Sequence, residues 1–298
     1  MLSQSFLQLN TIFISILIEA IPFVLIGVLI AGVIQIFVTE EMLAKVLPKN
    51  RFLAVIYATL LGALFPACEC GIVPIVRRLL QKGVPLHAGI AFMLTGPVIN
   101  PIVLFSTYVA FGNNWEMMLY RGGLAIIISF IVGIILSYQY KDNQLLDKLA
   151  VNQHHHISHE KQTIWGKLMD TLRHAVEEFF SVGKYLIVGA FVAAAMQTFI
   201  KTSTLLQIGQ NEASSSLVMM GLAFVLSLCS EADAFIASSF SSTFSTGSLV
   251  AFLVFGPMVD IKNTLMMLAV FKKRFVGQLI FYIAILVLAG SMLIGVMV

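Results

Sequence analysis

The sequence predicts an all-α polytopic membrane protein built from two homologous halves of about four spans each, with re-entrant or broken helices. Three observations predict this class: the composition, the number of long apolar stretches, and a likeness between the two ends of the chain. Of the 298 residues, 59% are hydrophobic and 11% are charged, and the mean hydropathy is +0.95. A soluble domain usually carries about 25% charged residues, so the polar side chains are too few to cover a water-soluble globule.

Eight apolar stretches are long enough, or nearly so, to cross a bilayer core of about 30 Å, which takes about 20 helical residues. The second and sixth are short and depend on their flanks. The first follows a polar start without the basic segment and cleavage site of a signal peptide, so we expect a retained helix. The expected spans are Thr11–Val38, Phe52–Ala67, His87–Gly112, Leu119–Tyr138, Val182–Ile200, Ser214–Cys229, Leu249–Ala269 and Phe275–Val298.

A hydrophilic, histidine-rich linker, residues 141–178, divides a first transmembrane repeat (1–140) from a second (179–298). Its basic residues predict a cytoplasmic position, and four preceding spans would then place the N-terminus in the cytoplasm too. Lys272, Lys273 and Arg274 are an exception, because eight spans would place them outside. The linker histidines are His154, His155, His156, His159 and His174.

These histidines allow two interpretations. His155 and His159 are four residues apart and share a face if the segment is helical, and histidine tracts bind metals. The linker has no further acidic or cysteine ligands at fixed spacing, which favours a solvated connection.

The two sides of the linker resemble one another. The segment from Glu19 to Gly27 aligns with the segment from Ser181 to Gly189 at a shift of 162 residues, and the same shift places Glu69 on Glu231. Residues 91–100 match residues 251–260 at a shift of 160. Two apolar segments can align by chance, but an acidic residue followed by Gly-Pro-x-x-Asn/Asp in both halves predicts an internal duplication, which is typical of secondary transporters.

Each repeat contains two interruptions of its apolar pattern. After each glutamate comes a segment of about 14 residues, 70–83 and 232–245, which is below spanning length and favours a re-entrant or interfacial helix. If both segments crossed, the chain would have ten spans and inverted halves. The second interruption is the Gly-Pro segment, where proline removes a helical hydrogen bond.

Broken helices at matching places in two repeats indicate a binding site near the midplane; a proline kink supported by its neighbours is the alternative. We expect Asn100 and Asp260 to face a shared polar cavity. We expect Glu69 and Glu231 to lie close together, so that one holds a proton and serves proton coupling. The candidate substrate-binding residues are Glu69, Gly96, Pro97, Asn100, Glu231, Gly256, Pro257 and Asp260.

Two further sets of residues are candidates. Glu19 and Lys184 lie within apolar runs and form a possible intramembrane charge pair, although Lys184 can also extend to the cytoplasmic surface. Cys68, Cys70 and Cys229 form a possible soft-ligand or metal site, because thiolates prefer soft ions. Buried cysteine is also a common apolar packing residue. We expect Cys68 and Cys70 to be reduced.

The stretch Phe65-Pro-Ala-Cys-Glu-Cys-Gly-Ile-Val-Pro74, followed by Leu94-Thr-Gly-Pro-Val-Ile-Asn-Pro101, resembles the ArsP-type predicted permeases of bacteria. The likeness covers nearly the whole chain. The resemblance implies a multi-pass permease of the bacterial cytoplasmic membrane, and some family members export trivalent organoarsenicals. This sequence carries no mark that assigns it an arsenical substrate.

The expected function is a permease, with efflux the expected direction, and not an enzyme. No Walker loop, dinucleotide fingerprint or hydrolase motif occurs, so we expect no cofactor, and ATP hydrolysis would need a separate subunit. The expected partners are the lipid bilayer, a small-molecule or ion substrate and a possible membrane partner subunit, with no nucleic acid. A membrane-embedded enzyme or a structural subunit of a larger complex is the alternative.

Overall fold

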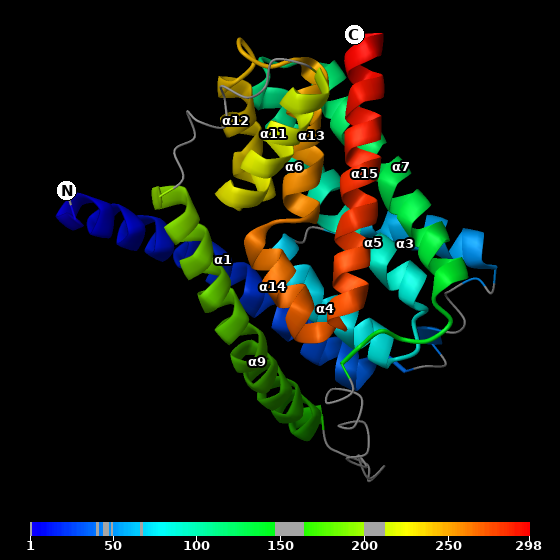
Figure 1. Ribbon diagram of the computed structural model, residues 1–298. Helices are drawn as coiled ribbons and strands as arrows, with labels where there is room; N and C mark the ends of the chain where they lie inside the picture. The colour runs from blue at the N-terminus through cyan, green and yellow to red at the C-terminus, as the bar shows by residue number, and fades with distance from the viewer. Residues whose placement is uncertain are drawn as a thin grey trace.

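The computed structural model describes residues 2–39, 42–43, 48, 50–65, 68–146, 164–199 and 212–298. Every regular element within these ranges is an α-helix, as the composition predicts (Figure 1). An isolated antiparallel bridge joins Leu145 to Phe271. The helices are α1 (Leu2–Phe37), α3 (Arg51–Leu64), α4 (Glu69–Gln81), α5 (Leu86–Ile99), α6 (Pro101–Ala110), α7 (Trp115–Gln139), α9 (Ile164–Phe199), α11 (Glu212–Leu226), α12 (Ser230–Ser239), α13 (Thr246–Met258), α14 (Ile261–Val270) and α15 (Lys273–Met297).

Six segments of the described chain are long and apolar enough to cross a membrane: α1, α5 with α6, α7, α9, α13 with α14, and α15. The second and sixth expected spans are instead α3 and α11, of 14 and 15 residues. At 1.5 Å per residue these helices reach about 21–23 Å, which is short of a bilayer core of about 30 Å. The eight expected spans therefore become six spans and two helical hairpins, α3–α4 and α11–α12.

The first hairpin opens toward the linker. Arg51, at the start of α3, donates a hydrogen bond to the carbonyl oxygen of Ser137 near the end of α7 (3.0 Å). Asn143, just after α7, donates to the carbonyl oxygen of Leu80 near the end of α4 (3.0 Å). At the other end of α3, Gly62 packs directly against Thr95. Since Thr95 lies near the middle of the α5–α6 span, the hairpin tip is in the interior.

The second hairpin opens toward the opposite side. Near the starts of α11 and α13, Ser248 Oγ donates to Ser215 Oγ (2.8 Å). At the tip, the Lys262 amide donates to Ser227 Oγ (3.4 Å), beside the break between α13 and α14. The far end of α14 lies on the linker side, because the Leu146 amide donates to the Val270 carbonyl (3.0 Å). The two hairpins therefore enter the bundle from opposite sides.

This arrangement changes the expected sidedness. Helices α1 and α9 run antiparallel, with Gly32 beside Thr171 and the Phe13 ring 6.0 Å from the Phe191 ring. Helix α1 therefore ends on the linker side, and three passes precede the linker instead of four. The N-terminal end of α1 then lies away from the linker. The basic residues 272–274 follow α14 on the linker side, where the Lys272 amide donates to Gln144 (3.0 Å), so the exception to the positive-inside rule disappears.

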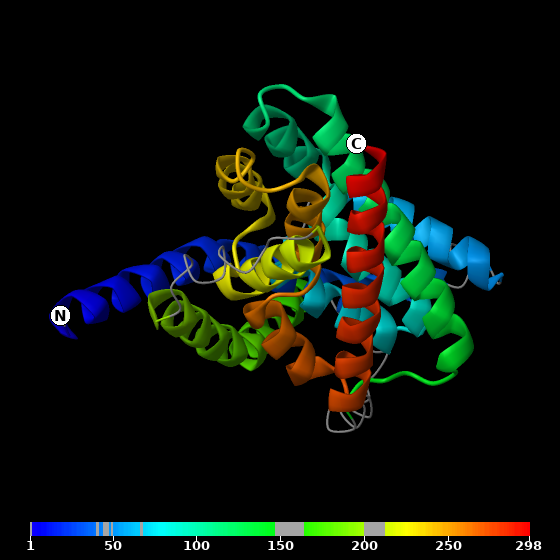
Figure 2. The same ribbon diagram turned by 45° about the horizontal axis from the view of Figure 1, so that its top comes forward.

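The helices before and after the linker follow one another with similar lengths. Their lengths pair as 36 and 36 residues (α1, α9), 14 and 15 (α3, α11), 13 and 10 (α4, α12), 14 and 13 (α5, α13), 10 and 10 (α6, α14), and 25 and 25 (α7, α15). Helix α9 begins inside the segment assigned to the linker. Helix α13 packs against α5, α7 and α15, while α1 and α9 pack on one another at one edge (Figures 1 and 2).

Candidate functional site at the hairpin tips

The tips of the two hairpins touch in the interior of the protein. Ser230, the first residue of α12, donates from Oγ to Oε2 of Glu69, the first residue of α4 (3.1 Å). Lys262, in the first turn of α14, lies beside the same carboxylate. The starts of α4, α12 and α14 therefore meet. Helix N-termini carry partial positive charge, which favours the carboxylates that the sequence places at these starts.

Glu69, Asp260 and Lys262 form a buried charge cluster. Lys262 Nζ lies 3.7 Å from Glu69 Oε1 and 3.7 Å from Asp260 Oδ2, and none of the three side chains is more than 2% exposed. These two carboxylate oxygens have no hydrogen-bond partner. The cluster therefore depends on charge attraction across gaps longer than a hydrogen bond.

The two predicted breaks have the same construction. Asn100 Oδ1 accepts a hydrogen bond from the Val103 amide (2.9 Å), and Asp260 Oδ1 accepts one from the Asn263 amide (2.6 Å). Both side chains are buried N-caps, of α6 and α14. Such caps satisfy the free amides that a helix break leaves. Asn100 and Asp260 thus have equivalent local roles, whereas a cavity shared by the two stays a prediction.

The Gly-Pro residues end the helices before these caps. Pro97 lies in the last turn of α5 and Pro257 in the last turn of α13. Gly96 packs so closely against Ile72 of α4 that any Cβ would overlap it. A Cβ at Gly256 would lie 3.3 Å from that of Ala223 in α11. Each break therefore contacts the hairpin of its own half.

All three cysteines of the chain are free thiols buried near this cluster. Cys68 is the N-cap of α4 and Cys229 the N-cap of α12, and neither thiol caps its helix by a hydrogen bond. Cys70 and Cys229 lie within electrostatic range of Lys262. In the described ranges, histidine, cysteine and acidic side chains form no group of three or more placed to hold a metal ion. A soft ligand at these thiols stays a hypothesis.

Arg121 of α7, which was not among the predicted site residues, is one of the largest fully buried side chains. Its guanidinium donates to both carboxylate oxygens of Asp233 in α12 (2.9 Å each), to Thr107 Oγ1 in α6 (2.8 Å) and to the Ser230 carbonyl (3.2 Å). A single arginine in the first turns of an apolar helix is a usable signal. Arg121 lies two residues inside the expected span that begins at Leu119.

A second ion pair fixes the linker end of α4. Glu178 of α9 accepts a hydrogen bond from Arg77 Nη1 and from Arg78 Nη2, at 2.5 Å each. The Glu178 side chain is 2% exposed. Because α9 carries this carboxylate, the first hairpin is attached to the second half of the chain at both of its ends.

The remaining candidate residues are less buried than the charge cluster. Glu19 and Lys184 are exposed and form no ion pair with one another within 4.0 Å; the expected pair is not formed, and the Lys184 ammonium lies 5.2 Å from the centre of the Tyr185 ring. Glu231 is half-buried and lies within electrostatic range of Glu69, so the glutamates are near one another, with Ser230 making the direct contact. The histidines of residues 147–163 lie outside the described ranges.

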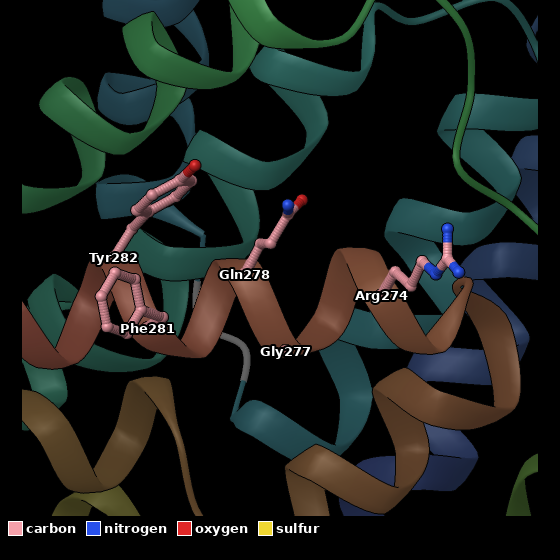
Figure 3. Close-up of a pocket in the computed structure, with 5 residues that line it drawn as sticks. All are labelled: Arg274, Gly277, Gln278, Phe281 and Tyr282. Carbon is pink, nitrogen blue, oxygen red and sulfur yellow. The ribbon is translucent and has the colours of Figure 1, made fainter.

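A hollow on the outer surface of α15 contains none of the predicted site residues. Figure 3 shows its lining, which includes Gln278, Phe281 and Tyr282 along one side of α15. The Tyr282 hydroxyl donates to Gln139 at the end of α7 (2.9 Å), and Tyr140 donates to Gln278. These bonds join α15 to the end of α7, so the hollow belongs to a helix contact.

The comparisons with known proteins agree with a membrane permease. The chain matches the predicted permease family of ArsP type over residues 5–296. UPF0718 protein YcgR of Bacillus subtilis (strain 168) is 73% identical over 291 residues, 98% of each chain. A Streptococcus mutans protein, named as a candidate subunit of a two-component membrane permease complex, is 45% identical over 296 residues, 99% of this chain and 98% of that one.

A more distant relative, UPF0718 protein MJ0584 of Methanocaldococcus jannaschii, is 23% identical over 146 residues, 48% of this chain and 40% of that one. No solved structure matches the chain. The family match and the apolar helices make this a multi-pass protein of the bacterial cell membrane. Since the match spans almost every residue, the chain belongs to the ArsP-type predicted permease family.

Proposed function

We propose that the protein is a secondary permease that exports a small solute, and that the solute binds where the hairpin tips meet the helix breaks. The contact between Ser230 and Glu69 is the observation that carries this proposal. It joins two hairpins that enter from opposite sides, at a point beside the buried charge cluster. A site placed there can open to either side when one hairpin moves away from the other.

The proposed binding residues come from both halves. Glu69 and the cap Asn100 belong to the first half, and Glu231 and Asp260 belong to the second. The Gly-Pro pairs bring the backbone close to the site, and the three thiols offer sulfur ligands to a solute with a soft centre. The expected direction, export, rests on the family resemblance.

We also infer that the halves are inverted repeats, residues 1–140 and 179–298, joined through the linker. The matched helix lengths and the equivalent caps Asn100 and Asp260 support this inference. Three passes in each half, an odd number, give the halves opposite orientations, and the hairpins enter from opposite sides as inversion requires.

A partner subunit in the membrane is part of the proposal. Its support is the name of the Streptococcus mutans relative, which refers to a complex of two components. A membrane-embedded enzyme is the second candidate. It would need buried polar groups, but it would not need two matched helix breaks.

The test begins with identification of the solute by comparing metabolites and metals in cells with and without the gene. Flux of that solute is then measured in reconstituted vesicles of both orientations. We expect Glu69→Gln to lower flux by about tenfold, equivalent to about 1.4 kcal/mol, and Glu231→Gln to have a smaller effect because Glu231 is only half-buried. Glu116→Gln, on the exposed start of α7, is the control.

Two results would refute the proposal. Product formation without flux would indicate an enzyme. Full flux in Glu69→Gln and in a variant with both Gly-Pro pairs replaced would show that the solute does not bind where the hairpin tips meet the helix breaks.

A further inference from the structure

The buried cluster contains more negative than positive charge. Glu69 and Asp260 share the single cation Lys262. The neighbouring Arg121–Asp233 pair is neutral by itself, because the Arg121 cation and the Asp233 carboxylate bond to one another and their charges cancel. One carboxylate of the cluster therefore has no counter-charge.

An uncompensated buried carboxylate is costly, by several kcal/mol even after relaxation. Such a group takes up a proton instead of remaining charged. Glu69 Oε1 and Asp260 Oδ2 are the two oxygens of the cluster without a hydrogen-bond partner, so each is a place where a proton can reside.

We propose that Glu69 is the binding site of a proton that couples transport, protonated while the hairpin tips touch and released when they separate and water enters. The inference rests on the proposed function and adds to it the coupling ion and the group that binds it. Lys262 remains as the internal counter-ion of Asp260.

Two features favour Glu69 over Asp260. The Asp260 carboxylate caps α14 through a 2.6 Å bond from an amide three residues away, and this local bond keeps the charge stabilised whatever the hairpins do. The Glu69 side chain accepts its hydrogen bond from Ser230 of the other hairpin. Separation of the tips breaks that bond and exposes Glu69, so its proton occupancy follows the movement.

The surroundings favour a proton over a metal cation. The Lys262 ammonium lies 3.7 Å from both carboxylates, where it would repel a bound metal ion. In the described part of the chain, no group of three or more histidine, cysteine or acidic residues could hold one. The other titratable or charged groups that face the cluster are Glu231, Asp233 with Arg121, Cys68, Cys70, Cys229 and, beside Cys229, Glu19.

Infrared difference spectroscopy of the whole protein in lipid tests the site without any solute. A protonated carboxyl gives a C=O stretch that a carboxylate does not. We expect one buried carboxyl band at neutral pH, lost in Glu69→Gln and kept in the exposed control Glu116→Gln. Asp260→Asn should weaken the band, because Lys262 then neutralises Glu69 alone. Ser230→Ala should shift its frequency, because the Ser230 hydroxyl donates to Glu69. We expect Lys262→Gln to increase the band about twofold, because two carboxylates then lack a cation.

The Lys262 variant keeps the test decisive if Glu69→Gln does not fold. Absence of the band in wild-type protein, its survival in Glu69→Gln, or an unchanged band in Lys262→Gln would overturn the inference. Removal of the band by sodium at constant pH would also overturn it, since sodium would then be the ion. A band that follows Glu69 in a protein that moves no solute would refute the proposed function and leave the proton site standing.

Discussion

The two hairpin helices that meet at the site have very different surroundings. In α4, ten of thirteen residues are buried; in α12, four of ten are buried. Their packing partners differ in the same way, since α14, against α4, buries six of ten residues and α6, against α12, buries two. Helix α4 therefore lies in an enclosed environment, and α12, at the corresponding place after the linker, lies in an open one.

The difference arises from α1 and α9. Gly27 of α1 packs against Gly71 of α4 so closely that a Cβ on either residue would overlap the other helix. Glu178 of α9 holds the linker end of α4. Within the described residues neither α1 nor α9 packs closely on α12, whose Phe235 side chain is 52% exposed. We infer that the structure is closed on the linker side, and the following changes test this comparison.

The largest effect is expected at the open hairpin, from Arg121→Leu. The substitution leaves the buried Asp233 carboxyl without its partner, and removal of one member of a buried ion pair costs about 3–5 kcal/mol. Denaturation of the purified protein measures the loss, and Arg173→Leu is a matched control because the Arg173 side chain is 79% exposed. A loss below about 1 kcal/mol, the range of a surface pair, would contradict the prediction.

A double substitution tests whether the unpaired Asp233 carboxyl causes the loss of stability in Arg121→Leu. Arg121→Leu combined with Asp233→Leu removes both charges, and we expect it to recover most of the stability lost in the single variant. No recovery in a double-mutant cycle would show that the bonds of Arg121 to Thr107 and Ser230 dominate.

The next effect is expected at the enclosed hairpin, from Gly27→Leu. The new side chain forces α1 away from Gly71, and overpacking of this kind costs about 1–3 kcal/mol. Because the only cysteines of the chain lie near the tips, the rate of maleimide labelling of wild-type and variant protein reports the opening. Gly221→Ala, which meets nothing within 4 Å, is the control. Equal labelling of Gly27→Leu and wild type would mean that α1 does not enclose α4.

A smaller effect is expected from Glu178→Gln. The amide keeps a hydrogen bond to one arginine but loses the charge attraction, so we expect about 1 kcal/mol of destabilisation, the difference between a charged and a neutral hydrogen bond. Labelling of Cys68 and Cys70 from the linker side should increase, while labelling from the other side should not. An increase from the other side alone would reverse our assignment of the closed side.

The smallest effect is expected from the double change Cys68→Ser and Cys70→Ser. Serine is a better N-cap than cysteine, which offsets the burial of a second hydroxyl, so abundance and stability should stay near wild type. If the thiols bind a soft solute, flux should fall without loss of protein. Loss of folded protein would show that the thiols are needed for packing.

The sequence predicted the helical class, the interrupted segments after Glu69 and Glu231, and the helix breaks at the Gly-Pro pairs, because each depends on local composition. The expected number of spans, eight, differs from the six candidate spans of the structure. The apolar runs at 52–67 and 214–229 are nearly long enough to cross a membrane, but their helices end at Leu64 and Leu226. The repeat alignment predicted that Glu69 lies near Glu231. The direct partners, Ser230 of Glu69 and Asp233 of Arg121, could not be predicted, because they are 161 and 112 residues away and no local pattern pairs them.

Those separations have a consequence for synthesis. When the ribosome has completed the first half, Glu69, Arg77 and Arg121 have already entered or approached the membrane, but every charged or hydroxyl group from the second half that stabilises them is still to be made. These charges of the first half therefore stay unpaired until α9, α12 and α14 have been synthesised and packed against it. Biogenesis of this protein is thus a single assembly reaction in which the late helices complete the early ones, and a chain truncated after residue 140 is expected to be degraded.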